Sequence, residues 1–97
     1  MSIAIGNKRK GDQGIYVGRP NPLGNPFVIG RDGEREDVIA KYSEWLNVLL
    51  QDPDSIQSRE IGRLTQLARK QDITLVCWCC PLACHAEVIR DAINERI

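Results

Sequence analysis

The apolar run ITLVCW at residues 73–78 limits the fold more than any other stretch of the chain. It joins apolar and β-branched residues without the polar alternation of a strand that has one side in water. A strand of this kind is covered on both faces, as the strands of parallel sheets are. We therefore predict that residues 73–78 form the central strand of a mainly parallel sheet, and that Pro81 lies beyond its end.

Two shorter strands are predicted near the N-terminus, at residues 3–5 (IAI) and 14–17 (GIYV). They are joined by a charged, glycine-containing stretch, residues 7–14, which fits either a hairpin or an offset pairing of the two strands. Residues 18–33 contain three prolines and four glycines, which excludes an ordinary helix or a central strand. This segment is predicted to be a long, stiff loop.

Three helices are predicted from the spacing of apolar residues. The first should run from Asp32, whose carboxylate would cap it, to about Gln51. The second should follow a cap at Ser55 or Ser58, and the third should run from Cys84 to the C-terminus. The predicted buried positions, three or four residues apart, are Val38, Tyr42, Trp45, Leu46 and Leu49, then Ile61, Leu64, Leu67 and Ala68, and last Val88, Ile89, Ala92, Ile93 and Ile97.

The length of 97 residues is typical of one domain with a modest core. The predicted order of two strands, two helices, a strand and a helix indicates the α/β class. We expect residues 1–97 to form a small single-domain, Rossmann-like three-layer sandwich, in which a short, mostly parallel sheet is flanked by about three helices.

Charge and hydropathy narrow the expected environment and partners. Thirteen basic residues balance thirteen acidic ones, so no overall field attracts a polyanion, and nucleic acid is not an expected partner. The cluster Lys8, Arg9 and Lys10 could contact a phosphate, although such runs are more often solvated turns. Trp45 and Trp78 are predicted to lie in the core, which leaves no stacking platform for bases. No stretch approaches the roughly 18 apolar residues of a membrane span, and the first residues do not resemble a signal peptide, so we expect a cytoplasmic location without membrane contact.

The segment CWCCPLACH at residues 77–85 holds all four cysteines and the only histidine. Thiolates and imidazole are zinc ligands, but on a strand Cys77 and Cys79 point to one face while Cys80 points to the other. The second, separated pair of ligands in a structural zinc site is also lacking. A redox pair is disfavoured as well, because a bridge between adjacent Cys79 and Cys80 would be strained. No metal and no cofactor are therefore predicted.

Cys84 and His85 are the candidates for chemistry in this segment. Cys84 is predicted at the start of the last helix, where amide dipoles favour an anion, so its thiol could act as a nucleophile or the nearby amides could hold a phosphate. The alternative is a small side chain that seals the corner between strand and helix. His85 could be a general acid or base, a ligand contact, or a helix-end residue bonded to the backbone.

The loop GRPNPLGNPF within residues 18–33 presents backbone amides on a stiff frame. Arg19 follows a strand end and could hold a phosphate or carboxylate through two hydrogen bonds. A simple surface connection is the alternative, but structureless loops longer than roughly 12–15 residues are usually functional or disordered, and this one is too apolar for disorder. The candidate ligand-binding residues are Gly18, Arg19, Asn21, Gly24, Asn25, Cys80, Cys84 and His85.

The two stretches IYVGRPNPLGNPFVIGRDGERE and CWCCPLACHAEVI together are specific enough to indicate a family. The chain resembles, over about residues 2–95, a small bacterial and bacteriophage family of domains of unknown function, family 4326. The resemblance implies a compact, Rossmann-like α/β fold and a nucleotide-type ligand.

The leading hypothesis is a cytoplasmic binding module for a phosphorylated or nucleotide-derived ligand, which in a phage could sequester a host nucleotide signal. One alternative is a nucleotide-processing enzyme of the hydrolase or glycosidase type, with Cys84 as nucleophile or His85 as acid–base group. Another is a regulatory protein that binds a host protein through a surface helix, since so short a chain gains buried area from a partner or from a homo-oligomer. The ligand hypothesis requires the glycine- and proline-rich loop and the cysteine-rich corner to meet at one edge of the sheet.

Overall fold

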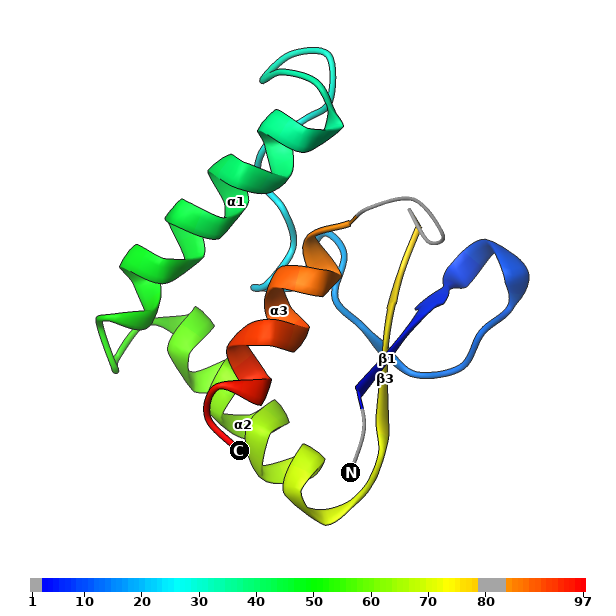
Figure 1. Cartoon of the computed structure of the whole chain (residues 1–97), viewed down its shortest axis with the longest axis vertical. Coiled ribbons are helices and arrows are strands. Elements are labelled where there is room, and N and C mark those ends of the chain that lie inside the picture. The colour runs from blue at the N-terminus through cyan, green and yellow to red at the C-terminus, as the bar shows by residue number, and fades with distance from the viewer. Residues whose placement is uncertain (1–2, 79–83) are drawn as a thin grey trace.

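A computed structural model describes residues 3–78 and 84–97 of the chain (Figure 1). Its elements are strand β1 (Ile3–Asn7), the short 3-10 helix η1 (Lys8–Lys10), strand β2 (Ile15–Tyr16), helices α1 (Arg35–Leu50) and α2 (Ile56–Lys70), strand β3 (Ile73–Cys77) and helix α3 (His85–Asn94). The predicted α/β class, with a parallel sheet and three α-helices, is confirmed in the described residues.

Strand β3 is the centre of the sheet, as its composition predicts. The strand order is β1-β3-β2, and both neighbours run parallel to β3. Leu75 pairs with Ile5 on one side and with Ile15 on the other, and Leu75 and Val76, on opposite faces, are both buried. A hairpin or offset pairing between the first two strands is wrong, because β3 lies between them.

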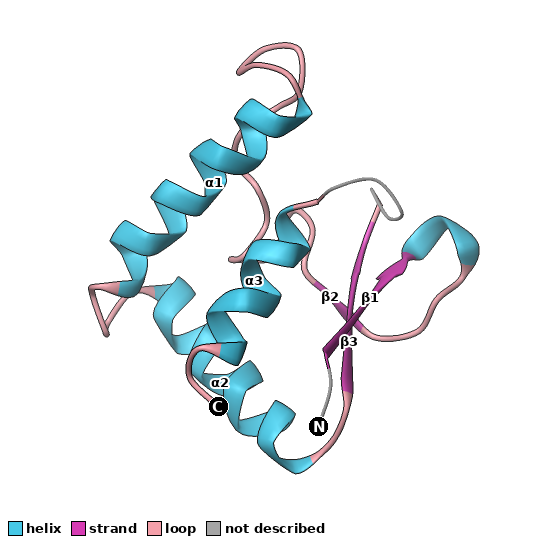
Figure 2. Ribbon diagram, in the orientation of Figure 1, coloured by secondary structure: helices cyan, strands magenta, loops and turns pink. Residues whose placement is uncertain are grey.

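One helix packs on the sheet, and the other two pack on that helix. Helix α3 packs directly against β1 and β3, and α1 and α2 pack against α3 and against each other. In Figure 2 the three helices lie on the same side of the strands. The core therefore forms between the sheet and these helices, with Leu75, Ile89, Ile93, Leu46 and Leu64 among its fully buried residues.

Most positions of the predicted helix stripes are buried or partly buried, but several predicted core positions need correction. Ile97 is 55% exposed because α3 ends at Asn94 and the chain leaves the core. Trp78, expected in the core, is 47% exposed because β3 ends one residue earlier. Four stripe positions are only partly buried: Trp45, Leu49, Leu67 and Val88.

The start of α1 also differs from the prediction, while the start of α2 agrees with it. The N-cap of α1 is Glu34 rather than Asp32, and the Asp37 carboxylate accepts a hydrogen bond from the Glu34 amide at 3.0 Å. Ser55, one of the two expected caps, begins α2, and its hydroxyl accepts a hydrogen bond from the Ser58 amide at 3.0 Å.

Within residues 3–78 and 84–97, no helix combines the length and the apolar character that crossing a membrane requires.

Candidate functional site

A pocket of about 360 Å³ lies at the carboxyl ends of β2 and β3, beside the N-terminus of α3. In parallel α/β sheets this edge is where loops and helix N-termini meet and where ligands bind. The residues that line it are Tyr16, Gly18, Arg19, Asn25, Phe27, Ile29, Arg35, Val38, Ile39, Cys77, Trp78, Cys84 and His85. The loop after β2 and the corner before α3 therefore contribute to one cavity.

The first part of the loop is tied to three different elements. The buried Tyr42 hydroxyl of α1 donates to the Leu23 carbonyl at 2.7 Å. The Gln57 side chain of α2 donates to the Pro22 carbonyl at 3.2 Å. Asn21 donates to the Tyr16 carbonyl of β2 at 3.1 Å and accepts from the Leu23 amide at 2.8 Å. These bonds hold the backbone of residues 21–23 against both helices and the end of β2.

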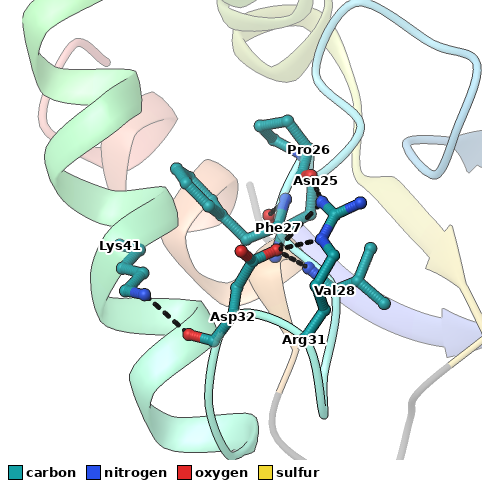
Figure 3. A network of polar contacts seen from close by, with 7 residues as sticks. All are labelled: Asn25, Pro26, Phe27, Val28, Arg31, Asp32 and Lys41. Atoms are coloured by element: carbon teal, nitrogen blue, oxygen red, sulfur yellow. Dashed lines mark hydrogen bonds and ion pairs between the residues drawn. The ribbon is translucent and has the colours of Figure 1, made fainter.

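The second part of the loop is closed by the side chains that Figure 3 shows. Asn25 accepts a hydrogen bond from the Phe27 amide at 2.9 Å, which forms the tight turn typical of asparagine. Asp32 accepts from the Val28 amide at 2.8 Å and from the Arg31 guanidinium, and Lys41 of α1 donates to the Asp32 carbonyl at 2.7 Å. The Val28 amide and then Arg31 lower the pKa of Asp32. Asp32 thus closes the turn before α1 instead of capping the helix.

His85, the first residue of α3, is 8% exposed, and its ring lies edge-on to Tyr42 with the ring centres 5.1 Å apart. Its Nε2 lies 2.8 Å from the Val17 carbonyl, which can only accept, so Nε2 carries the proton. Burial lowers the pKa of His85, and the charge of Arg19 lowers it further, against the opposing effect of the Val17 carbonyl. The imidazole is therefore neutral near pH 7, and its Nδ1 is an acceptor that lies 3.4 Å from the Cys84 sulfur.

Two cysteines that line the pocket, Cys77 and Cys84, lie in contact. The sulfur atoms of Cys77, at the end of β3, and Cys84, the N-cap of α3, are 2.7 Å apart, and both residues are buried. The Cys84 sulfur also accepts from the Ala86 amide at 3.5 Å. The two cysteines are seven positions apart in the sequence, and their spacing did not indicate this pair because the contact depends on how the chain returns to the sheet.

Basic and aromatic side chains line and border the pocket. The Trp78 indole donates to the Tyr16 hydroxyl at 3.1 Å, so the two rings lie together at the edge of the sheet. Lys8 lies 5.2 Å from the centre of the Tyr16 ring, and the Arg9 guanidinium lies 5.9 Å from that of Trp78. Trp78, which was predicted to lie in the core, therefore lies at the pocket, and the reason for excluding a stacking platform for bases no longer holds.

The structure brings five of the eight candidate residues to the pocket: Gly18, Arg19, Asn25, Cys84 and His85. Asn21 and Gly24 shape the loop instead; a Cβ on Gly24 would lie 2.9 Å from the Arg19 amide nitrogen. Cys80 lies outside the described residues.

Arg35 lines the pocket but was not identified from the sequence. It precedes Val38 and Ile39 by three and four residues, so all three share one helix face. That spacing was the available signal. Within residues 3–78 and 84–97, no group of three His, Cys, Asp or Glu side chains is arranged to hold a metal ion.

Comparison with known proteins supports one assignment. No curated protein and no solved structure matches the chain. The family model described as "Domain of unknown function (DUF4326)" matches residues 4–95, nearly the whole chain. The chain therefore belongs to the DUF4326 family.

Proposed function

We propose that the domain binds a small phosphorylated ligand of the nucleotide type in the pocket between the loop after β2 and the N-terminus of α3. The observation that carries the proposal is the composition of this one cavity, which combines two arginines, Arg19 and Arg35, with the aromatic residues Tyr16, Phe27 and Trp78. Guanidinium groups suit phosphate oxygens, and aromatic rings suit a planar base.

The charges support the phosphate part of the proposal. Arg19 and Arg35 reach the pocket from two separate segments, the loop after β2 and the first turn of α1. Arg9 lies at the same edge beside Trp78. The chain as a whole carries no net charge, so this local gathering of cations is what would attract an anion.

The size of the pocket supports a ligand of about mononucleotide size. Its volume of about 360 Å³ lies at the lower end of the range for small-molecule sites, roughly 300–1,000 Å³. We expect one nucleoside and one or two phosphates to be accommodated, with the base against Trp78 and the phosphate toward the arginines.

The test is calorimetric titration with nucleoside mono- and diphosphates, the matching nucleosides, and inorganic phosphate. We expect phosphorylated nucleosides to bind and Arg35→Gln to weaken binding about tenfold or more, since a charge-assisted hydrogen bond contributes about 1.5–3 kcal/mol. The matched control is Arg59→Gln on α2, an exposed arginine that does not line this pocket. If no nucleotide binds more tightly than about 1 mM, or if both variants weaken binding equally, the proposal fails.

A second candidate function is an enzyme that processes such a ligand, with Cys84 as nucleophile and His85 as its base. The contact of 3.4 Å between the Cys84 sulfur and His85 Nδ1 favours it, because a nucleophile next to a neutral imidazole can be deprotonated. Incubating the protein with the nucleotide that binds, and following nucleobase or phosphate release by chromatography, tests this candidate. Unchanged turnover in Cys84→Ser would exclude Cys84 as the nucleophile.

A further inference from the structure

We propose that Cys77 and Cys84 form a peroxide-responsive redox pair that closes reversibly into a disulfide at the pocket. The sulfur atoms lie 2.7 Å apart, whereas a disulfide bond measures about 2.05 Å, so little movement is needed to join them. The inference concerns the chain's own thiols and does not depend on whether the pocket binds a nucleotide.

Cys84 has the surroundings of a reactive thiol. Its sulfur lies at the N-cap of α3, where it accepts from the Ala86 amide at 3.5 Å, and the helix dipole favours a negative charge there. His85 Nδ1, at 3.4 Å, presents a lone pair to the same sulfur because the Nε2 proton is committed to the Val17 carbonyl. Cys84 is therefore the residue that reacts first, and His85 is its proton acceptor.

Cys77 is placed to complete the reaction. It ends β3, and its backbone is fixed by pairing with Asn7 of β1, so its sulfur is held beside that of Cys84. Both cysteines are at most 2% exposed, but both line the pocket, which gives a molecule as small as hydrogen peroxide a route to them.

The chemistry balances with hydrogen peroxide as the oxidant. Cys84 passes its proton to His85 Nδ1, and the thiolate attacks one peroxide oxygen; the O–O bond breaks, a sulfenic acid forms, and the leaving hydroxide takes the proton from His85 to become water. The Cys77 sulfur then attacks the Cys84 sulfur, the S–O bond breaks, and the second hydroxide leaves as water with the Cys77 proton. Two thiols and one peroxide give one disulfide and two waters, and a dithiol reductant reverses the change.

Two other cysteines in the chain must be removed from the test. Cys80 stands three residues after Cys77, a spacing at which many redox pairs form, and Cys79 is also present. The double variant Cys79→Ser, Cys80→Ser keeps Cys77 and Cys84 as its only cysteines. After treatment with a few equivalents of hydrogen peroxide and alkylation of the remaining thiols, intact mass and peptide mapping should show a loss of two hydrogen atoms and a peptide pair joined through Cys77 and Cys84.

Further variants in the same background separate the two roles. Adding Cys77→Ser should leave a sulfenic acid on Cys84 that dimedone traps, whereas adding Cys84→Ser should give little adduct on Cys77. Adding His85→Gln should slow disulfide formation about tenfold at neutral pH and move its pH profile upward, because a rise of one unit in the thiol pKa lowers the thiolate fraction about tenfold.

Two results would overturn the proposed cysteine pair, and a third would overturn the role of His85 in it. The first is a folded double variant, by circular dichroism, whose thiols both remain alkylatable after peroxide that oxidises an unfolded control. The second is a metal ion bound one to one by the purified protein and lost on Cys77→Ser, since the thiolates would then serve as ligands. The third, an unchanged rate and pH profile for His85→Gln, would remove His85 from the reaction.

Discussion

The hydroxyl of Tyr42 should contribute more to stability than any other side-chain group that holds the loop after β2. Tyr42 and Leu23 are both 0% exposed, and the hydroxyl donates to the Leu23 carbonyl at 2.7 Å. Burial raises the pKa of Tyr42, so the group stays protonated and continues to donate. In Tyr42→Phe the ring remains in the core, but the carbonyl loses its donor and has no access to water. Leaving a buried polar group unsatisfied costs about 1–3 kcal/mol.

The matched control is Tyr16→Phe. The Tyr16 hydroxyl also donates to a carbonyl of this loop, that of Arg19 at 2.8 Å, and it accepts from the Trp78 indole at 3.1 Å, but both bonds are exposed, so water can replace them. We expect Tyr16→Phe to change the free energy of unfolding by less than about 0.5 kcal/mol. Urea and thermal denaturation followed by circular dichroism measure both, and each kcal/mol lowers the Tm of a domain of this size by about 4–8 °C. Equal losses in the two variants, or a loss under about 0.5 kcal/mol for Tyr42→Phe, would refute the reasoning.

Three other predictions follow from single sites. Because the pKa of His85 is lowered in the folded state, the unfolded chain takes up this proton at a higher pH than the folded chain does. The free energy of unfolding should therefore fall as the pH decreases below about 6.5, by at most about 1.4 kcal/mol per pH unit. Urea titrations between about pH 7.5 and 5.5 measure this loss, which should be absent in His85→Gln. Gly62→Ala, at an open helical position with no neighbour within 4 Å, should stabilise the protein by about 0.5–1 kcal/mol, whereas Gly33→Ala, at a φ of +128°, should destabilise it. A nucleotide-type ligand should quench the tryptophan fluorescence of Trp45→Phe, which retains the pocket residue Trp78, but it should not quench that of Trp78→Phe. Quenching only in Trp78→Phe would place the ligand outside this pocket.

Much of the fold follows from short-range patterns in the sequence. The apolar run that became β3 is buried on both faces, and the helix stripes led by Leu46, Leu64 and Ile89 all face the core. These patterns are predictive because burial repeats with the period of each element. The central place of β3 could also be predicted from its composition, but the register in which β1 and β2 pair with it could not.

The errors at single residues have a common physical cause. Asp32 is a good helix cap by type, but its carboxylate is engaged by the Val28 amide, and Glu34 occupies the cap position. Trp78 follows an apolar run, but the strand pairing stops at Cys77 and leaves the indole at the pocket. In each case a bond or a register set by the tertiary structure decides the outcome, and residue type does not reveal it.

The sequence predicted the location of the candidate site more accurately than the residues that line it. Its two halves could be placed at one sheet edge, because parallel strands end on the same side and one motif follows each of β2 and β3. The contact between Cys77 and Cys84 depends on how the chain returns to the sheet, so spacing could not predict it. The spacing of Arg35 from Val38 and Ile39 indicates their common helix face, but tertiary packing decides that this face lines the pocket.

The ligand and redox proposals concern the same cavity, so they make a joint thermodynamic claim. Cys77 and Cys84 line the pocket together with Arg19 and Arg35, and a disulfide would join the end of β3 to the start of α3 in its lining. If the disulfide changes the Kd of a ligand by some factor, that ligand must change the equilibrium constant between dithiol and disulfide by the same factor. A tenfold factor corresponds to about 1.4 kcal/mol. Titrating one nucleotide into the reduced and the oxidised Cys79→Ser, Cys80→Ser variant measures this factor. A Kd that differs between the two states would make the thiol pair a regulator of binding, whereas an identical Kd would show that the two functions share a cavity without influencing each other.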